Sequence, residues 1–355
     1  MIEAVELRRV SLPLVTPFRT SFGTETTRDA LLVHVIGPDS EGWGECVAMS
    51  SPGYSAEYVD GAQDVMRRYL VPGLFGAAQP VRGHPMARAA VEGAVLDASL
   101  RARGTSLAAH LGGVREAVDV GVSVGIVRPV EALVDAVSAY VGQGYRRVKL
   151  KIEPGWDRVP VAAVRARFAD LMLQVDANGA YGRDKAGTLD ALDEFGLALI
   201  EQPLPEDDLA GHAELAGRLS TPICLDESIT SARVADLAIA LGACSVVNIK
   251  PGRLGGLVEA KRVHDVCVSR GVPAWCGGML ETGIGRAANL ALAALPGFTL
   301  PADLSASDRY FHRDLTPPFV LADGRLAVPA GPGIGVPVLE DALHELTTSV
   351  EVLRP

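Results

Sequence analysis

Five charged residues in the middle of the chain recur at nearly constant spacing and carry groups suited to acid–base and metal chemistry. Lys151, Asp176, Glu201, Asp226 and Lys250 follow one another at intervals of 25, 25, 25 and 24 residues. Each one ends a short apolar run, and an ionised group in an apolar setting is costly unless it is paired or bound to a metal. The spacing therefore predicts a set of charged side chains gathered for a chemical purpose.

The three acidic members of this series predict a site for a hard divalent cation. Asp176, Glu201 and Asp226 close consecutive runs with no base between them, so their carboxylates would repel one another. Oxygen ligation with room for water and substrate favours Mg²⁺, and Mn²⁺ or another divalent cation is the expected substitute. A single carboxylate of this kind is as readily explained by a salt bridge, but three in register favour the metal.

The lysines are the candidate bases. Lys149 and Lys151 lie two residues apart, so in a strand both point to the same side. We expect their mutual repulsion and partial burial to lower a lysine pKa toward neutrality. Lys151 is the better placed base, while Lys149 would tune it or pair with a carboxylate. Arg253, three residues after Lys250, would depress the pKa of Lys250 further, contact a substrate anion or simply lie at the surface.

The elements that position these residues are repeated strand–helix units. Apolar runs that alternate with helix-forming stretches predict a parallel sheet covered by helices, and eight such units close a barrel. A leucine-rich solenoid has a similar period, but its internal consensus is absent. The eight runs are VGVSVGIV, RVKLKI, LMLQVDAN, LALIEQPL, PICLDES, SVVNIKPG, PAWCGG and FTLPADLS.

In such a barrel the catalytic mouth lies at the carboxyl ends of the strands. Runs two and six are opposite in a ring of eight, so Lys151 and Lys250 are expected to face each other with the acidic triplet between them. A carbon acid held there would have one base on each face. This arrangement predicts a two-base enzyme that removes a proton next to a carboxylate.

The rest of the chain predicts a second, smaller unit. VELRRVSLPL, LLVHVIGP and WGECVA read as strands, and helices are expected at about 56–70 and 86–103. After the last run, LADGRLAVPAGPGIGV predicts a hairpin followed by coil that packs back on the N-terminal part. We therefore expect an α+β capping domain with substrate-specificity loops at 1–115, the catalytic barrel at 116–303 and a C-terminal segment at 304–355.

Composition narrows the class of protein. A net charge of −10 argues against a nucleic-acid partner. No run approaches the ~20 apolar residues needed to cross a bilayer, so no membrane partner is expected. Five scattered cysteines form no disulfide or zinc pattern. We expect a cytoplasmic protein.

The motifs KLK, VDAN, IEQP, LDES, NIKPG and WCGGMLETGIG resemble the enolase superfamily, in its muconate-lactonising-enzyme subgroup. PFRTSFGT, SSPGYSAEY, KLKIEPGWD, NIKPGRLGG and TLPADLSASDR further resemble the N-succinylamino acid racemase/o-succinylbenzoate synthase family, over nearly the whole chain. The resemblance implies a modified TIM (β/α)7β barrel with an N-terminal α+β capping domain completed by the C-terminal tail. In that superfamily a lysine base works with Mg²⁺ on a proton next to a carboxylate.

The family's residues carry over position by position. The resemblance implies metal ligands at Asp176, Glu201 and Asp226 and catalytic lysines at Lys151 and Lys250. It implies an acyl pocket at Phe18, Tyr54, Ser123, Gly278, Met279 and Asp303. The auxiliary residues are Lys149, Arg253, Asn178 and Glu281, the last of which would orient a lysine or cap a helix.

The family catalyses two reactions on small-molecule carboxylates. Its synthase reaction dehydrates a cyclohexadiene carboxylate to the menaquinone precursor o-succinylbenzoate and needs one lysine, whereas racemisation of an N-acyl amino acid needs both. A dipeptide epimerase or muconate-type cycloisomerase on the same scaffold is the alternative, and a non-catalytic carboxylate-binding barrel is a more distant one. The family also implies a homo-oligomer, an octamer or a dimer.

Overall fold

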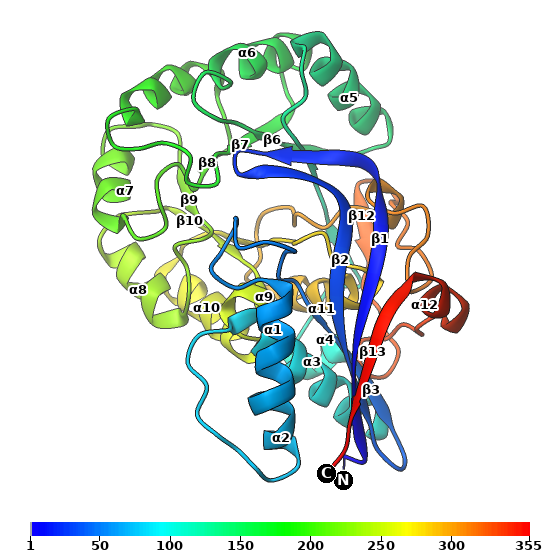
Figure 1. Ribbon diagram of the computed structural model, residues 1–355. Coiled ribbons are helices and arrows are strands. Elements are labelled where there is room, and N and C mark those ends of the chain that lie inside the picture. Colours follow the sequence, from blue (N-terminus) through cyan, green and yellow to red (C-terminus); the bar gives the residue numbers. More distant parts are fainter. Residues whose placement is uncertain (1) are drawn as a thin grey trace.

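The two ends of the chain meet in one antiparallel sheet. The computed structural model describes residues 2–355, and in this range the sheet has four strands in the order β13-β1-β2-β3 (Figure 1). The strands are β1 (Ala4–Thr20), β2 (Gly23–Ile36), β3 (Glu41–Cys46) and β13 (Thr347–Leu353). Since β13 pairs with β1 from Val5 to Val10, the C-terminal tail completes the capping sheet as predicted.

Helix α3 (Pro85–Ala102) covers one face of this sheet at very short range. Gly42 and Gly44 of β3 make the approach possible, because a Cβ at Gly44 would lie 2.0 Å from the carbonyl oxygen of Ala90. The expected helix near 86–103 is thus confirmed, and the one expected at 56–70 begins slightly later and is divided. The other helices here are α1 (Val59–Val65), the π-helical turn η1 (Met66–Leu70), α2 (Val71–Leu74) and α4 (Leu107–Leu111).

A curved parallel sheet forms the second part of the molecule. Strands that are consecutive in the chain are neighbours in this sheet, as repeated strand–helix units require. They are β5 (Val122–Val124), β6 (Arg147–Lys151), β7 (Met172–Asp176), β8 (Ile200–Glu201), β9 (Ile223–Leu225), β10 (Val246–Ile249) and β11 (Ala274–Cys276). The eighth predicted run closes the ring through parallel bridges of Phe298 to Ala274 and of Ala302 to Val120. The predicted (β/α)7β barrel is therefore confirmed.

Helices surround this barrel and cover the outer side of its strands, while side chains fill the inside. Every residue of β5, β6, β8, β9, β10 and β11 is buried, as expected for a parallel sheet that is filled inside and covered outside. The unit after β7 contains a 3₁₀ helix, η2, in place of an α-helix. The surrounding helices are α5 (Val130–Gly142), α6 (Arg158–Arg167), η2 (Ala186–Phe195), α7 (Leu209–Ala216), α8 (Ala232–Ala240), α9 (Pro251–Leu254), α10 (Leu257–Arg270) and α11 (Gly283–Ala293).

The segment after the barrel is more ordered than the sequence suggested. The predicted hairpin is only a tight turn from Ala322 to Arg325, and β12 (Arg325–Ala327) pairs with β4 (Ala117–Asp119) instead. A short 3₁₀ helix, η3 (Ser307–Arg309), precedes it, and helix α12 (Glu340–Leu346), which the sequence did not predict, leads into β13. In residues 2–355, no helix is long and apolar enough to span a membrane.

The β1–β2 hairpin connects the two parts of the molecule. One end belongs to the capping sheet, and the other extends over the barrel near β6 and β7 (Figure 1). There the Ser21 hydroxyl donates to the carbonyl of Ala177 at 3.2 Å, and the Ile126 amide donates to the carbonyl of Arg19 at 2.9 Å. The hairpin tip therefore covers the end of the barrel at which the charged residues emerge.

Candidate active site

The five regularly spaced charged residues emerge at the same end of the barrel. Lys151, Asp176 and Glu201 are the last residues of β6, β7 and β8, and Asp226 and Lys250 directly follow β9 and β10. Lys151 is in register with Asp176, and Asp176 with Glu201. The strand placement that the spacing predicted is thus what the structure shows.

Lysine ammonium groups contact each of the three carboxylates. Lys151 Nζ lies 2.7 Å from Asp176 Oδ2, and Lys250 Nζ lies 2.7 Å from Asp226 Oδ2. Lys149 Nζ lies 3.0 Å from Glu201 Oε2 and 3.1 Å from Asp176 Oδ2. All three acids are fully buried, so these ion pairs supply the compensation that buried charges require.

Lys149 is the centre of this network. Its third partner is Asp303, whose Oδ2 lies 2.8 Å away, and Asp303 also accepts from Arg147 Nη1 at 3.2 Å and from the Ser123 hydroxyl at 2.7 Å. Of the two roles considered for Lys149, the structure shows carboxylate pairing. Asp303 and Ser123, predicted as substrate contacts, direct their polar groups toward this network.

The expectation of a lowered lysine pKa is wrong for Lys149 and for Lys250. Burial disfavours the charged form of Lys250, but attraction to Asp226 outweighs burial and raises the pKa of Lys250 well above its usual range. The pKa of Lys149 is likewise raised, because attraction to Asp303, Glu201 and Asp176 outweighs its burial. For both lysines, direct contact with carboxylates decides the direction of the shift.

Arg253 and Asn178 both form hydrogen bonds with the charged residues of the site. Arg253 Nη2 donates to Asp226 Oδ1 at 2.9 Å, and its Nη1 donates to the carbonyl of Glu227 at 2.9 Å. Arg253 is therefore neither a surface residue nor free for a substrate anion. Asn178 Oδ1 accepts from Lys151 Nζ at 2.7 Å, while its Nδ2 donates to Glu227 at 2.9 Å. Asn178 thus fixes the position of Lys151.

Glu281 has neither of its two predicted roles. Its Oε1 accepts a hydrogen bond from Asn289 Nδ2 at 2.8 Å, and in the described range no lysine pairs with it. The N-terminal residue that caps α11 is Thr282, whose hydroxyl accepts from the Ile284 amide. Glu281 instead forms part of the pocket wall.

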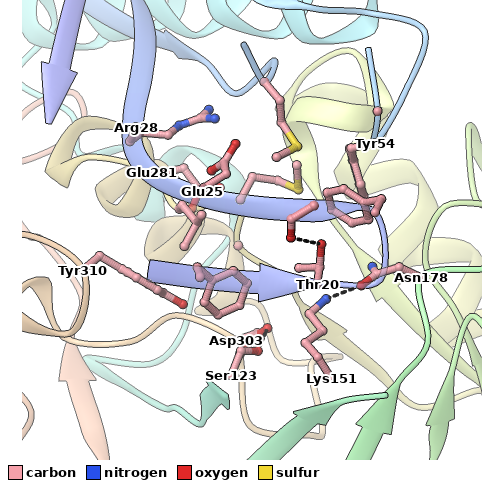
Figure 2. Close-up of a pocket in the computed structure, with 18 of the residues that line it drawn as sticks. Thr20, Glu25, Arg28, Tyr54, Ser123, Lys151, Asn178, Glu281, Asp303 and Tyr310 are labelled. Atoms are coloured by element: carbon pink, nitrogen blue, oxygen red, sulfur yellow. Dashed lines mark hydrogen bonds between the residues drawn. The ribbon is translucent and has the colours of Figure 1, made fainter. Parts of the chain in front are cut away.

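One pocket of about 170 Å³ lies between the barrel mouth and the hairpin (Figure 2). Lys149, Lys151 and Lys250 line it, whereas the three fully buried carboxylates lie behind them. All the residues predicted for the acyl pocket line it as well, namely Phe18, Tyr54, Ser123, Gly278, Met279 and Asp303. Residues from the capping hairpin and from the barrel thus form one enclosure around the two catalytic candidates.

Lys151 and Lys250 enter this pocket from opposite sides of the barrel. Their strands, β6 and β10, have β7, β8 and β9 between them in the parallel sheet. Lys250 Nζ also lies 3.4 Å from the Tyr54 hydroxyl, and the Tyr54 ring packs 5.6 Å from the ring of Phe22 at the hairpin tip. A small molecule in the pocket would therefore lie between two lysines and under an aromatic cover.

The acidic triplet provides the oxygen donors that a hard divalent cation prefers. Its donors are carboxylate oxygens at neighbouring strand ends, and burial together with repulsion from Asp176 raises the pKa of Glu201 to about 8. Within residues 2–355, no three His, Cys, Asp or Glu side chains converge closely enough to hold a metal. Each of the three acids pairs with a lysine ammonium group instead.

Sequence reasoning missed several charged and polar members of the site. Arg147 and Asn248 lie two residues before Lys149 and Lys250, so the same period-two argument applied one step further would have found them. Asn248 Nδ2 donates to Glu201 Oε1 at 2.7 Å. Arg28 also lines the pocket but comes from the antiparallel hairpin, where no repeat marks it.

Comparison with known proteins places this geometry in a family. Residues 132–342 match the family described as "Enolase C-terminal domain-like". An N-succinylamino acid racemase of Amycolatopsis sp is 58% identical, covering 98% of each chain, and an o-succinylbenzoate synthase of Geobacillus kaustophilus is 49% identical, covering 95% of this chain and 93% of that protein. The crystal structure of an enolase superfamily member from Listeria innocua superimposes with a TM-score of 0.93 at 39% identity, covering 99% of each chain.

Proposed function

The chain belongs to the enolase superfamily and, within it, to the family of N-succinylamino acid racemases and o-succinylbenzoate synthases, and on that basis we propose its reaction. It is an enzyme that removes the proton alpha to the carboxylate of an N-succinyl amino acid and returns a proton to the opposite face. Its second activity is o-succinylbenzoate synthesis. Two lysines and a divalent cation, Mg²⁺, carry out the chemistry.

The observation that carries this proposal is the pair of lysines in one pocket. Lys151 and Lys250 line the same cavity from strands on opposite sides of the barrel. In racemisation one lysine, uncharged, takes the α proton from one face, and the other, charged, donates a proton to the opposite face. The number of protons is conserved, and the two lysines exchange roles for the opposite enantiomer.

Asp176, Glu201 and Asp226 would hold the cation. Bound there, Mg²⁺ supplies a positive charge that stabilises the second negative charge developing on the substrate carboxylate. The attraction of Asp176 and Asp226 now holds the lysine ammonium groups in place. Carboxylates neutralised by another cation would attract these ammonium groups less and leave them freer to act on a substrate.

The same residues suffice for the synthase reaction. Dehydration removes the α proton and the neighbouring hydroxyl, which together leave as water. A single lysine that takes the α proton and passes it to the departing hydroxyl is therefore enough. Asn178 would keep Lys151 oriented through its 2.7 Å hydrogen bond in either reaction. The second lysine would stabilise the charge that develops on the substrate.

Proton exchange in D₂O tests the proposal. The enzyme with Mg²⁺ should incorporate deuterium at the α carbon of both N-succinyl-L-phenylalanine and the D enantiomer. Lys151→Ala and Lys250→Ala should each abolish racemisation, and each should retain exchange with at most one enantiomer. Lys261→Ala serves as the control, because Lys261 is exposed and pairs with Asp265 on α10.

The two reactions are judged separately. Absence of deuterium uptake from both enantiomers by the unmodified enzyme would refute the racemase activity. The synthase activity is followed by the appearance of o-succinylbenzoate from its cyclohexadiene precursor in the presence of Mg²⁺. Loss of activity in Lys261→Ala equal to that in Lys151→Ala would refute the assignment of the lysines.

A further inference from the structure

Arg28 is a buried cation without a partner in the wall of the pocket. It lies on β2, it is only 1% exposed, and it lines the cavity (Figure 2). Its Nε and Nη2 atoms are buried with no hydrogen-bond partner in the described part of the chain, and no ion pair to Arg28 is formed there. A guanidinium cannot lose its charge in a protein, so this charge is uncompensated by contact.

The other cations that line the pocket are all engaged. Lys149, Lys151 and Lys250 contact carboxylates at 2.7 to 3.1 Å. Arg286 donates to the carbonyls of Ser305 and Glu281. Arg286 keeps one atom without a partner, its Nε, whereas Arg28 has two such atoms. Among the pocket residues of the described chain, Arg28 is therefore the cation with the most donors left for a ligand.

Nearby acids hold Arg28 in a favourable field without pairing with it. The positive charge of Arg28 acts to lower the pKa of Glu25 and of Glu45. Neither carboxylate lies within 4.0 Å of the Arg28 guanidinium. Both Glu45 oxygens are already used, because they accept from Thr282 and Gly285. An unpaired buried charge is destabilising, and the penalty is relieved when an anion supplies the missing acceptors.

A succinyl group presents such an anion at a suitable position. It carries a carboxylate two methylenes beyond the amide carbon, about 6 Å from the α carbon when extended. Figure 2 shows Arg28 and Lys151 on opposite sides of the pocket, with Arg28 on the hairpin strand β2 and Lys151 at the barrel. A substrate with its α carbon at the lysines would therefore extend its acyl arm across the cavity toward Arg28.

Building on the proposed function, we propose that Arg28 binds the distal carboxylate of the succinyl arm. A planar guanidinium with free Nε and Nη2 donors matches a carboxylate in a two-point contact. This contact selects a charged acyl arm over a neutral one. The same arm is present in the o-succinylbenzoate skeleton, so Arg28 serves both reactions as a specificity residue.

Matched substrates that differ only in the charge of the arm test the proposal. The rate constant kcat/KM is measured with N-succinyl-L-phenylalanine, with its uncharged succinamoyl analogue of equal length, and with N-acetyl-L-phenylalanine. Arg28→Met should lower kcat/KM for the succinyl substrate by roughly 10- to 100-fold, as expected for hydrogen bonds between charged groups. It should change the two neutral substrates by less than about threefold. Arg28→Lys should recover part of the loss.

Arg19→Met is the control, because Arg19 lies on the same hairpin, pairs with Glu153 and does not line the pocket. An equal fall for charged and neutral substrates, or no fall for the succinyl substrate, would overturn the role of Arg28. Turnover of the neutral substrates shows that the variant is folded. If the unmodified enzyme turns over none of the substrates, the proposed function fails. Calorimetric binding of the succinyl and acetyl compounds to the enzyme and to Arg28→Met then decides the role of Arg28 separately.

Discussion

Replacement of Lys149 by Met should destabilise the enzyme strongly at neutral pH. Lys149 is 2% exposed, and its Nζ contacts Asp303, Glu201 and Asp176 at 2.8, 3.0 and 3.1 Å. Methionine keeps the volume but leaves three buried carboxylates without their shared cation. Breaking a buried ion pair by removing one partner costs about 3–5 kcal/mol, so we expect a loss of that size in the free energy of unfolding.

The loss should shrink in acid. The pKa of Asp303 is held well below its usual range, because Lys149 and Arg147 outweigh the effect of its burial. A carboxylate with a lowered folded-state pKa stabilises the protein above its unfolded-state pKa, and that stabilisation fades as the pH falls. The difference between the two proteins should therefore be largest near pH 7 and should decrease below about pH 4.

The assay is equilibrium urea unfolding in the presence of a chelator, followed by far-UV circular dichroism and tryptophan fluorescence. Trp275 is a local reporter, because Lys149 Nζ lies 5.0 Å from the centre of its ring. Arg325→Met is the control, since it breaks the exposed Arg325–Asp119 pair and should cost less than about 1 kcal/mol. A loss for Lys149→Met no larger than for this control would refute the view that Lys149 is the counter-charge of the site.

Three further predictions concern the metal, a titrating acid and the capping sheet. Chelation should abolish α-proton exchange, and added Mg²⁺ should restore it. The Asp226→Asn variant should not regain exchange at the same Mg²⁺ concentration. Full exchange in the chelated enzyme would contradict the metal requirement. Burial raises the pKa of Glu45 from 4.5 to about 7, so the stability of the enzyme relative to Glu45→Gln should fall by at most about 3 kcal/mol as pH rises through that range. Thermal unfolding of both proteins between pH 4 and 8 measures this difference, and an increase in the relative stability with pH would contradict the prediction. Gly44→Ala should destabilise by about 1–3 kcal/mol or more because its Cβ meets the backbone of α3, whereas Gly23→Ala at the open hairpin tip should be nearly neutral in the same melts.

Much of the barrel could be predicted because its charged residues repeat with the period of one strand–helix unit. That period placed Lys151, Asp176 and Glu201 at strand ends, where the structure has them. The direction of the lysine pKa shifts could not be obtained this way, because it depends on which group lies nearest in space. The sequence put Lys149 beside Lys151, whereas the fold adds Asp303 from a segment far along the chain.

The capping part was predictable in outline and not in its contacts. Strand-like runs and the α3 helix were evident from composition. Helix α12 was missed because it is a single short segment outside the repeat. Arg28 reaches the pocket only because β1 and β2 are long enough to extend from the capping sheet to the barrel mouth. No local sequence pattern shows which part of the barrel the tip of a long antiparallel hairpin will contact.

The β1–β2 hairpin also means that the pocket walls and the proton-transfer groups come from different parts of the chain. The lysines and carboxylates come from the barrel, whereas Phe18, Phe22 and Arg28 come from the β1–β2 hairpin, whose base is held by strand β13. Substitutions near the hairpin tip reshape the walls around the substrate without moving the proton-transfer groups. The walls of the pocket and its proton-transfer groups are thus encoded by separate segments of the chain, so a change in one segment leaves the residues of the other in place.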